Sequence, residues 1–301
     1  MNPAISVHSM SRRYRNHLAL NDVSFQIDGP SITGLLGRNG AGKSTLMRIL
    51  AAQEYPTAGS AQLFGRHVWE DAAVLRRIAL VREDQEYPDM RVSQIVRAAS
   101  WFHPNWCDDL ATEMLDEFEL PRQRPVKKLS RGMRSALGIV IGVAARAEVT
   151  LLDEPYAGLD AVARRMFYDR LLGDYAIHPR TVVLSTHLID EAADLMEHVI
   201  LVDHGRIVLD APADDVRGGA TTVTGPAEIV DRFVADRPIW ECRRLGSQQS
   251  VVMAGVLDDV DCARARDMHL ELHPLSLQEI VVYAAGQALR DDAKTKEGAP
   301  A

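Results

Sequence analysis

GRNGAGKST, the stretch from Gly37 to Thr45, fits the pattern G-x-x-x-x-G-K-[ST] at every fixed position. The apolar, strand-like ITGLL precedes it and the helix-like TLMRILAAQ follows it, which is the context that this pattern needs. Glycines let backbone N–H groups close around phosphate oxygens, and the new helix points its positive end at them. The stretch therefore predicts a phosphate-binding loop. Its candidate binding residues are Gly37, Asn39, Gly40, Ala41, Gly42, Lys43, Ser44 and Thr45.

Three side chains at the end of this loop have separate expected roles. Lys43 would reach the β- and γ-phosphates of a nucleotide, Ser44 would bind Mg²⁺, and Thr45 would donate to the α-phosphate. A glycine-rich turn without a ligand is the alternative interpretation. The complete match and its flanking elements favour phosphate binding.

Two acidic residues end a buried, strand-like run, VTLLDE, at Val149–Glu154. Asp153 would hold Mg²⁺ through water, as a hard cation beside phosphates requires. Glu154 is the candidate general base, because hydrolysis needs a carboxylate that polarises the attacking water. Capping of the next turn, before Pro155, is the alternative role for both acids. The phosphate-binding loop upstream favours the catalytic role.

Two further stretches each admit two interpretations. His187 directly follows the apolar run TVVLS, so it is a candidate for contacting the γ-phosphate and positioning the water. A lone histidine is more often an edge residue satisfied by its neighbours, but its place about one βα unit beyond Asp153 favours the phosphate role. The stretch LSRGM, Leu129–Met133, almost matches a phosphate-sensing signature. Taken alone, it favours an ordinary helix start with Ser130 as the N-cap.

The order of apolar runs predicts an α/β fold with three regions. Strand-like alternations frame the glycine-rich loop from about residue 5 to 65, a helical pattern runs from about 83 to 145, and short buried strands return from 149 to 209. Continuous apolar runs flanked by helices predict a sheet covered on both faces, with a helical insertion between its two halves.

The composition changes past Pro212, where PADDVRGGATT is predicted to be a linker. A strand–helix–strand–strand–helix–strand order and a last helix follow, which is compatible with a small ferredoxin-like α+β module. We expect a nucleotide-binding domain at residues 1–215 with a helical subdomain at about 84–145, the module at 216–288, and a disordered tail at 289–301.

Composition argues against several classes of protein. The net charge of −8 disfavours a general nucleic-acid binder, since phosphate contacts need a basic face. The 3 cysteines form no C-x-x-C pair, so we expect neither a disulfide framework nor a zinc site. The N-terminus lacks the apolar run of a signal peptide. The longest apolar-and-glycine run, Ala136–Ala145, is far shorter than the roughly 20 residues that cross a bilayer, so no lipid insertion of its own is expected.

With its motifs in this order, the chain from about residue 5 to 215 resembles the ATP-binding-cassette (ABC) ATPase family. GRNGAGKST resembles its Walker A loop, LSRGM its signature, VTLLDE its Walker B motif and AGLD, Ala157–Asp160, its D-loop. The resemblance implies a P-loop NTPase domain with a mixed sheet, an antiparallel β subdomain and a helical insertion. It also implies ATP hydrolysis with ATP and Mg²⁺, His187 as the switch histidine, Asp160 as the D-loop acid, and Tyr14 as the aromatic that stacks on adenine.

Two motifs depart from the family's pattern. The family's signature is usually Leu-Ser-Gly-Gly-Gln, whereas here Arg131 and Met133 replace Gly and Gln. We hypothesise that Arg131 adds positive charge near the phosphates. In the Q-loop, Glu83 stands where a glutamine normally ligates Mg²⁺, with Gln85 two residues on, and either residue could serve. The signature residues implied by the resemblance are Leu129, Ser130, Arg131, Gly132 and Met133.

The resemblance implies that the signature covers the ATP of the opposite protomer. Since this chain has one copy of each motif, we expect a homodimer or a heterodimer of ATPase subunits with ATP at the two-fold interface. We expect no membrane helices in this chain, so a transporter that contains it needs a separate integral membrane permease. That permease would hold this chain at the cytoplasmic inner face of the cell membrane. The helical insertion also contains four ring-bearing residues that could line a permease groove or form a local core: Trp101, Phe102, His103 and Trp106.

The closing run SLQEIVVYAAG, the LSRGM variant and the Q-loop glutamate resemble subunits of multidrug and ABC-2-type exporters. We therefore expect an exporter ATPase. An ATPase of an importer, a soluble ATP-gated clamp on nucleic acid or ribosomes, and a regulatory module with weak hydrolysis remain as alternatives. The acidic balance disfavours the clamp, and Glu154 disfavours the regulatory module.

Overall fold

The computed structural model describes residues 2–286 and divides into two compact units, which we describe separately. The first unit holds the chain up to Leu188 and the segment Leu195–Ile207. The second unit holds Ile189–Asp194 and the chain from Val208 onward. The predicted tail at 289–301 and the last positions of the predicted module lie outside the described residues.

An antiparallel sheet forms one layer of the first unit, in the order β2-β1-β4-β5. The central strand β1 pairs with β2 and β4, so Ile5 has Ile27 and Leu63 as its register partners. Apolar residues on β2 alternate with exposed polar ones, which gives the sheet one buried face. The strands are β1 (Ile5–Tyr14), β2 (His17–Ile27), β4 (Ala58–Leu63) and β5 (Arg66–His67).

A second sheet has the order β10-β9-β3-β8-β7-β6. From β9 to β6 its neighbouring strands are parallel, and β7 and β8 are buried along their whole length. Strands that are apolar throughout suit a parallel sheet covered on both faces. The carboxyl ends of these strands meet at one edge, where ligands bind in such sheets. The strands are β3 (Ser31–Leu36), β6 (Ile78–Arg82), β7 (Val149–Asp153), β8 (Thr181–Ser185), β9 (His198–Asp203) and β10 (Arg206–Pro212).

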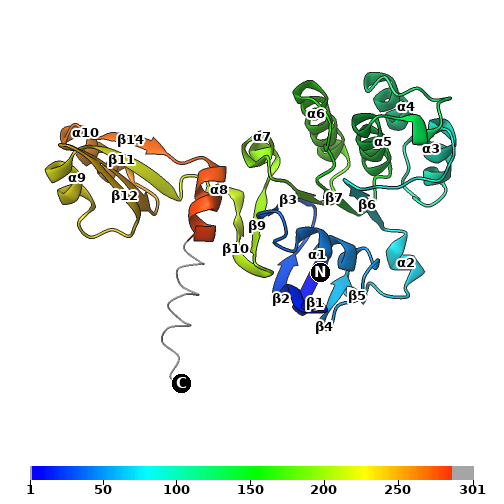
Figure 1. The fold of residues 1–301 in the computed structure, drawn as a ribbon, viewed down its shortest axis with the longest axis horizontal. Coiled ribbons are helices and arrows are strands. Elements are labelled where there is room, and N and C mark those ends of the chain that lie inside the picture. The colour runs from blue at the N-terminus through cyan, green and yellow to red at the C-terminus, as the bar shows by residue number, and fades with distance from the viewer. Residues whose placement is uncertain (1, 287–301) are drawn as a thin grey trace. The chain divides into compact units, whose positions relative to one another are not determined.

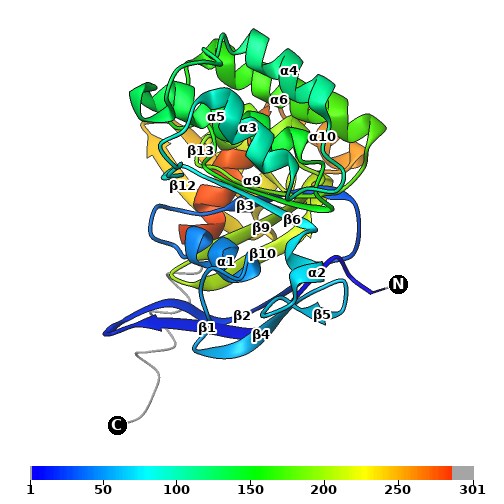
Figure 2. The same cartoon turned by 90° about the vertical axis from the view of Figure 1, so that its right-hand side faces the viewer.

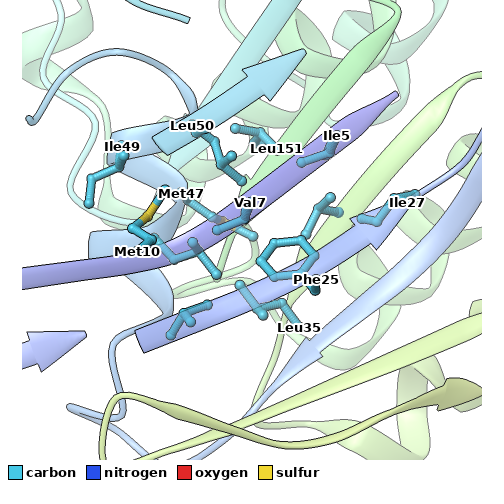
Figure 3. Close-up of a cluster of buried hydrophobic side chains, with 14 of the residues drawn as sticks. Ile5, Val7, Met10, Phe25, Ile27, Leu35, Met47, Ile49, Leu50 and Leu151 are labelled. Carbon is cyan, nitrogen blue, oxygen red and sulfur yellow. The ribbon is translucent and has the colours of Figure 1, made fainter. Parts of the chain in front are cut away.

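Helix α1 (Lys43–Leu50) lies between the two sheets, as Figure 2 shows. Figure 3 shows its Met47 and Leu50 in one buried cluster with Phe25 of β2 and Leu151 of β7. This cluster joins both sheets through a single helix. Because α1 begins at Lys43, packing of its apolar face also fixes the end of the phosphate-binding loop.

Helix α5 packs on β6 and β7 from the other side of the parallel sheet, and α3, α4 and α6 pack against α5 (Figures 1 and 2). The helical insertion expected at about 84–145 thus contains α3, α4 and α5. The helical elements from α2 to α6 are α2 (Ala72–Leu75), α3 (Val92–Ser100), α4 (Asp108–Glu117), η1 (Val126–Lys128), α5 (Arg131–Ala144) and α6 (Ala161–Ile177).

The sequence left open whether the aromatic residues of the helical insertion line a permease groove or form a local core, and the structure separates them. Trp106 packs against Ala79, Ala145 and Ala147, so it belongs to a small local core. Trp101 and Phe102 are instead 72% and 68% exposed. Those two side chains are free to contact another molecule.

The second unit contains a four-stranded antiparallel sheet in the order β12-β13-β11-β14. Side chains from the sheet and from both helices share one buried cluster, which includes Val223, Phe233 and Met253. The chain order β11-α9-β12-β13-α10-β14 is that of a ferredoxin-like module (Figure 1). The elements are α7 (Ile189–Ala192), η2 (Ala193–Leu195), α8 (Ala213–Val216), β11 (Ala220–Pro226), α9 (Ala227–Val234), β12 (Ile239–Leu245), β13 (Gln248–Ala254), α10 (Asp259–Asp267) and β14 (Glu271–Pro274).

Two features of the second unit go beyond the sequence pattern. The stretch predicted to be a linker forms α8 and leads directly into β11. A further helix spans the described residues 277–286, and at its start the Ser276 hydroxyl and the Gln278 N–H donate to the Asp190 carboxylate at 3.4 Å and 3.3 Å. No helix among the described residues combines the length and the apolarity that crossing a bilayer demands.

Candidate active site

The phosphate-binding loop leaves the carboxyl end of β3 and ends in the first turn of α1. Gly42 is the N-cap of α1 with a φ of 115°, a left-handed conformation that favours glycine. A Cβ at this position would stand 2.6 Å from the carbonyl oxygen of Ala19, so the close packing of the loop on β2 also requires glycine. The N–H groups of the first helical turn have no partner within a helix, which suits them to bind an anion.

Lys43 is buried to 6% exposure at the base of this loop. Its ammonium group donates to the carbonyl oxygens of Gly37 at 2.6 Å and Arg38 at 3.2 Å, and lies 4.0 Å from Glu154 Oε1. Burial lowers the pKa of Lys43, while the charges of Glu154 and Asp153 act in the opposite direction. A buried ammonium group that two loop carbonyl oxygens hold beside the N-terminus of α1 is well placed to bind a phosphate anion.

Glu154 follows β7 with a φ of 47°, an uncommon conformation for a residue with a side chain. Its Oε2 atom accepts hydrogen bonds from the Tyr156 hydroxyl at 2.9 Å and pairs with His187 Nδ1 at 2.6 Å. Its Oε1 atom is buried and has no hydrogen-bond partner. One oxygen is thus fixed by two side chains, and the other is available to a ligand on the Lys43 side.

Asp153 lies at the end of β7 and is 6% exposed. Its Oδ1 atom accepts a hydrogen bond from the Ser185 hydroxyl at 3.0 Å, and its carbonyl oxygen accepts one from the Glu83 N–H at 3.0 Å. The ends of β6, β7 and β8 are therefore tied together beneath the candidate catalytic residues.

One cleft of about 480 Å³ brings the phosphate-binding loop together with three of the other residues that the sequence singled out. Glu83, Glu154 and His187 face the loop across it, whereas Gln85 lines a neighbouring cleft. The geometry thus favours Glu83 over Gln85 as the residue beside a bound phosphate. The loop residues of this cleft are Arg38, Asn39, Gly40, Ala41, Gly42, Lys43, Ser44, Thr45 and Arg48.

The signature residues Leu129–Met133 do not line this cleft. Ser130 is the N-cap of α5, as predicted, and accepts a hydrogen bond from the Met133 N–H at 3.2 Å. Gly132 packs against the D-loop, because a Cβ at this position would stand 2.5 Å from the carbonyl oxygen of Gly158. Asp160 of the D-loop is the N-cap of α6 and accepts from the Ala163 N–H at 2.8 Å.

Tyr14 also lies outside the cleft. Its hydroxyl donates to the Glu54 carboxylate, and the Arg12 guanidinium stands 4.6 Å above its ring. Glu54 in turn accepts a hydrogen bond at 3.1 Å from Arg48, a residue that lines the cleft. Tyr14 is thus connected to the site through one acidic residue.

The donor set fits a magnesium ion bound together with phosphates. Among the described residues, no group of three or more His, Cys, Asp or Glu side chains could hold a metal by itself. Mg²⁺ at nucleotide sites commonly uses one or two protein ligands, the phosphates and water. The cleft offers Ser44 and Glu83, which matches such a partial set, whereas Asp153 does not line it.

The comparisons with known proteins agree with this geometry. The family described as ABC transporter matches residues 20–157. The doxorubicin resistance ATP-binding protein DrrA of Mycobacterium tuberculosis is 32% identical over 242 residues, which cover 77% of this chain and 72% of that protein. The chain belongs to the ATP-binding proteins of ABC transporters. The sequence-based predictions of the family, its α/β fold and its ATPase activity are confirmed.

Other relatives match this ABC ATP-binding protein over different lengths. The daunorubicin resistance ATP-binding protein DrrA3 of Streptomyces coeruleorubidus is 27% identical and covers 98% of this chain and 99% of its own. The Nod factor export ATP-binding protein I of Ralstonia nicotianae is 33% identical over 68% of this chain and 65% of its own. A solved ATP-binding subunit of an ABC transporter has a TM-score of 0.64 at 24% identity, covering 71% of this chain and 91% of that one, which shows the shared fold.

Sequence reasoning missed three participants in the site of this ABC ATP-binding protein. Tyr156 and Thr186 bond to each other through their hydroxyls, and Tyr156 also holds Glu154. Gly158 provides the surface on which the signature packs. The sequence does contain a signal for Tyr156, because this residue lies only two positions after Glu154 and is therefore close enough to contact its carboxylate. Nothing local marks Thr186 as its partner, since 30 residues separate the two.

Proposed function

We propose that this protein is the ATPase subunit of an ABC-2-type exporter and that two ATPase subunits close around two molecules of Mg-ATP. The main support for this proposal is that the motifs of one chain do not all lie in the same cleft. The phosphate-binding loop, Glu154 and His187 line one cleft, while Ser130 lies outside that cleft in the same chain. A second subunit would supply the missing side of each site, as in a two-fold head-to-tail pair.

The polar residues in and around the cleft have separate roles in this proposal. Lys43 binds the β- and γ-phosphates, Ser44 and Glu83 hold Mg²⁺, and Asp153 supports the ion through water. Bound Mg²⁺ would neutralise charge on the phosphates during transfer. Tyr14 remains the candidate for stacking on adenine.

Glu154 acts as the general base in this proposal, and His187 contacts the γ-phosphate. The Tyr156 hydroxyl and the His187 ring hold one oxygen of Glu154, which leaves the other free to accept a proton from the attacking water. Hydrolysis then depends mainly on positioning and on electrostatic stabilisation.

The relatives support a role in export. One relative is named for doxorubicin resistance, another for daunorubicin resistance and a third for Nod factor export. ABC ATP-binding subunits work with membrane permeases, and this chain has no membrane-crossing helix among its described residues. We therefore propose a permease partner, a position on the cytoplasmic face of the membrane, an ATPase domain at residues 1–215 and a separate C-terminal module from residue 216.

Trapping the closed dimer tests the shared site. Glu154→Gln keeps the size of the side chain but removes the base, so Mg-ATP is expected to convert this variant to a dimer in sedimentation experiments. Adding Ser130→Asp should abolish that dimer, because aspartate still caps α5 but repels the γ-phosphate. A protein that stays monomeric with Mg-ATP, alone and with its permease, would contradict the proposal.

A mixing experiment tests whether the two sides come from different subunits. Lys43→Ala lacks the phosphate ligand but keeps its signature, and Ser130→Asp has the reverse defect. In the Glu154→Gln background, each is expected to stay monomeric alone. Mixed together they should form heterodimers with one intact site. Failure of the mixture to pair would argue against sites built from two chains.

The export role is tested by isolating the protein from its native membranes. We expect it to co-purify with a polytopic membrane protein that works without an extracellular substrate-binding protein. Co-purification with a permease and such a binding protein would instead indicate an importer.

A further inference from the structure

Arg131 lies where three motifs of the same chain meet. Its Nη2 atom donates to Oε1 of Glu83 in the Q-loop. The aliphatic part of its side chain lies on the D-loop, since its Cγ stands 3.2 Å from the position that a Cβ of Gly158 would occupy. The signature is thus joined to the Q-loop by charge and to the D-loop by packing.

Glu83 stands between two clefts. Its backbone is fixed at the carboxyl end of β6, where its N–H donates to the Asp153 carbonyl oxygen at 3.0 Å. Its side chain lines both the nucleotide cleft and a neighbouring cleft of about 350 Å³, whose other wall includes Arg131 and Arg134 of α5. With 46% of this side chain exposed, the carboxylate is free to turn toward either cleft.

Glu83 has two candidate partners, Arg131 and a bound Mg²⁺ ion, and they are needed at different times. Before ATP binds, the cleft already holds the carboxylate of Glu154 beside Lys43, and an unpaired Glu83 would add a second negative charge facing an incoming triphosphate. Pairing with Arg131 neutralises that charge. Once Mg²⁺ arrives with the nucleotide, the same carboxylate is required as a metal ligand, and the guanidinium becomes a competitor for it.

From this arrangement we infer that Arg131 is a positioning residue that binds Glu83 of its own chain until Mg-ATP takes that carboxylate over. This inference rests on the proposed function and names a regulation of the same site. Binding of Mg-ATP in one cleft then frees the signature arginine of that chain, which becomes available to the nucleotide of the opposite subunit. Occupancy of one site thereby prepares the other.

The geometry favours this role over the simpler expectation that Arg131 only adds positive charge near the phosphates. Arg131 does not line the nucleotide cleft of its own chain, and its guanidinium already has a carboxylate partner. The arginine and the glutamate also depart together from the family's usual glycine and glutamine. A charge pair explains both departures at once.

ATP binding to the monomer tests the inference, because a contact with the opposite subunit's nucleotide cannot contribute there. The affinity of a fluorescent ATP analogue is measured at protein concentrations below dimerisation, once with EDTA and once with Mg²⁺. Arg131→Gln is expected to weaken binding about three- to fivefold in EDTA, the upper range for an exposed ion pair, because it leaves Glu83 unpaired. With Mg²⁺ the variant should bind no more weakly than the wild type.

A double variant tests whether Arg131 acts through Glu83. Adding Glu83→Gln to Arg131→Gln should restore wild-type affinity in EDTA, because no unpaired carboxylate remains. Asp89→Asn is the matched control, since it breaks the nearby exposed pair with Lys127, whose two atoms lie 2.5 Å apart, and should leave both affinities unchanged. Arg131 is 63% exposed, so its replacement should not disturb folding, which a melting curve checks.

The possible results separate this inference from the proposed function. Equal weakening by Arg131→Gln with and without Mg²⁺, no weakening in EDTA, or no rescue by Glu83→Gln would each overturn the inference while leaving the ATPase assignment intact. Failure of the wild-type protein itself to bind the nucleotide would overturn the proposed function.

Discussion

Gly132 of the signature and Gly158 of the D-loop are in direct contact: a Cβ on Gly132 would lie 2.5 Å from the carbonyl oxygen of Gly158. The Ser135 hydroxyl reinforces this contact one turn later, where it donates to the Ala157 carbonyl oxygen at 2.6 Å. The first turn of α5 and the D-loop therefore form one packed unit within the chain. The glycine is required by this packing whether or not its N–H also meets a nucleotide.

Gly132→Ala tests this contact. The added methyl group must displace the D-loop backbone, so we expect ATP-dependent dimerisation and hydrolysis to fall at least tenfold while ATP binding to the monomer is kept. Gly173→Ala in α6 is the control, because nothing lies within 4 Å of its Cβ position. That variant should gain about 0.5–1 kcal/mol in unfolding free energy, the usual gain for alanine in a helix. Full activity of Gly132→Ala would show that the two loops can separate without loss.

Tyr156→Phe tests how Glu154 is held. The Tyr156 hydroxyl donates to Glu154 Oε2 at 2.9 Å but does not line the nucleotide cleft. Its loss should lower kcat about tenfold, since a hydrogen bond to a charged group contributes about 1.5–3 kcal/mol. The KM for ATP should not change. Steady-state kinetics check both values, and a change in KM with unaltered kcat would mean that Tyr156 acts on nucleotide binding instead.

Asp174→Asn tests a buried ion cluster on α6. The Asp174 carboxylate is 2% exposed and accepts hydrogen bonds from Arg146 at 2.7 Å and Arg180 at 2.8 Å. Removing its charge leaves two guanidinium groups without their counter-ion, so the free energy of unfolding should fall by about 3–5 kcal/mol. Denaturant titration measures this change.

The same helix provides the control for that experiment. Asp169 pairs with Arg165 at 3.1 Å, but its side chain is 60% exposed. Asp169→Asn should therefore lower the free energy of unfolding by no more than about 0.5 kcal/mol. Similar losses in the two variants would show that burial does not set the strength of these pairs.

Asp261→Asn tests the pH dependence of the second unit. The hydrogen bond from Arg237 lowers the pKa of Asp261 below its usual 3.8. A carboxyl group with a lowered pKa in the folded state binds fewer protons there than in the unfolded state. Its contribution to stability is therefore present above the unfolded pKa and is lost as the pH falls through the folded one.

We thus expect Asp261→Asn to have a lower melting temperature than the wild type at pH 7, and the difference should close as the pH is lowered below 3.8. Asp267→Asn, at the other end of α10, is the control, since a carboxylate at a helix C-terminus gains nothing from the helix dipole. A difference between Asp261→Asn and the wild type that stays constant with pH would indicate that the carboxylate charge is not involved.

The sequence by itself determined the phosphate-binding loop, the acids after β7, the N-cap at Ser130 and the order of elements in both units. Each of these depends on contacts between residues a few positions apart, so the local pattern contains the information. The family resemblance then supplied the role of LSRGM, which the pattern alone would have given to an ordinary helix start.

Only the tertiary structure decided which distant residues share a site. It brought Glu83 rather than Gln85 to the cleft, placed Gly158 against Gly132, and paired Arg131 with a glutamate 48 positions away. These choices depend on how β6, β7 and α5 pack, because the direction of a side chain at a strand end is set by neighbours that the chain reaches only after folding. No local periodicity records those neighbours.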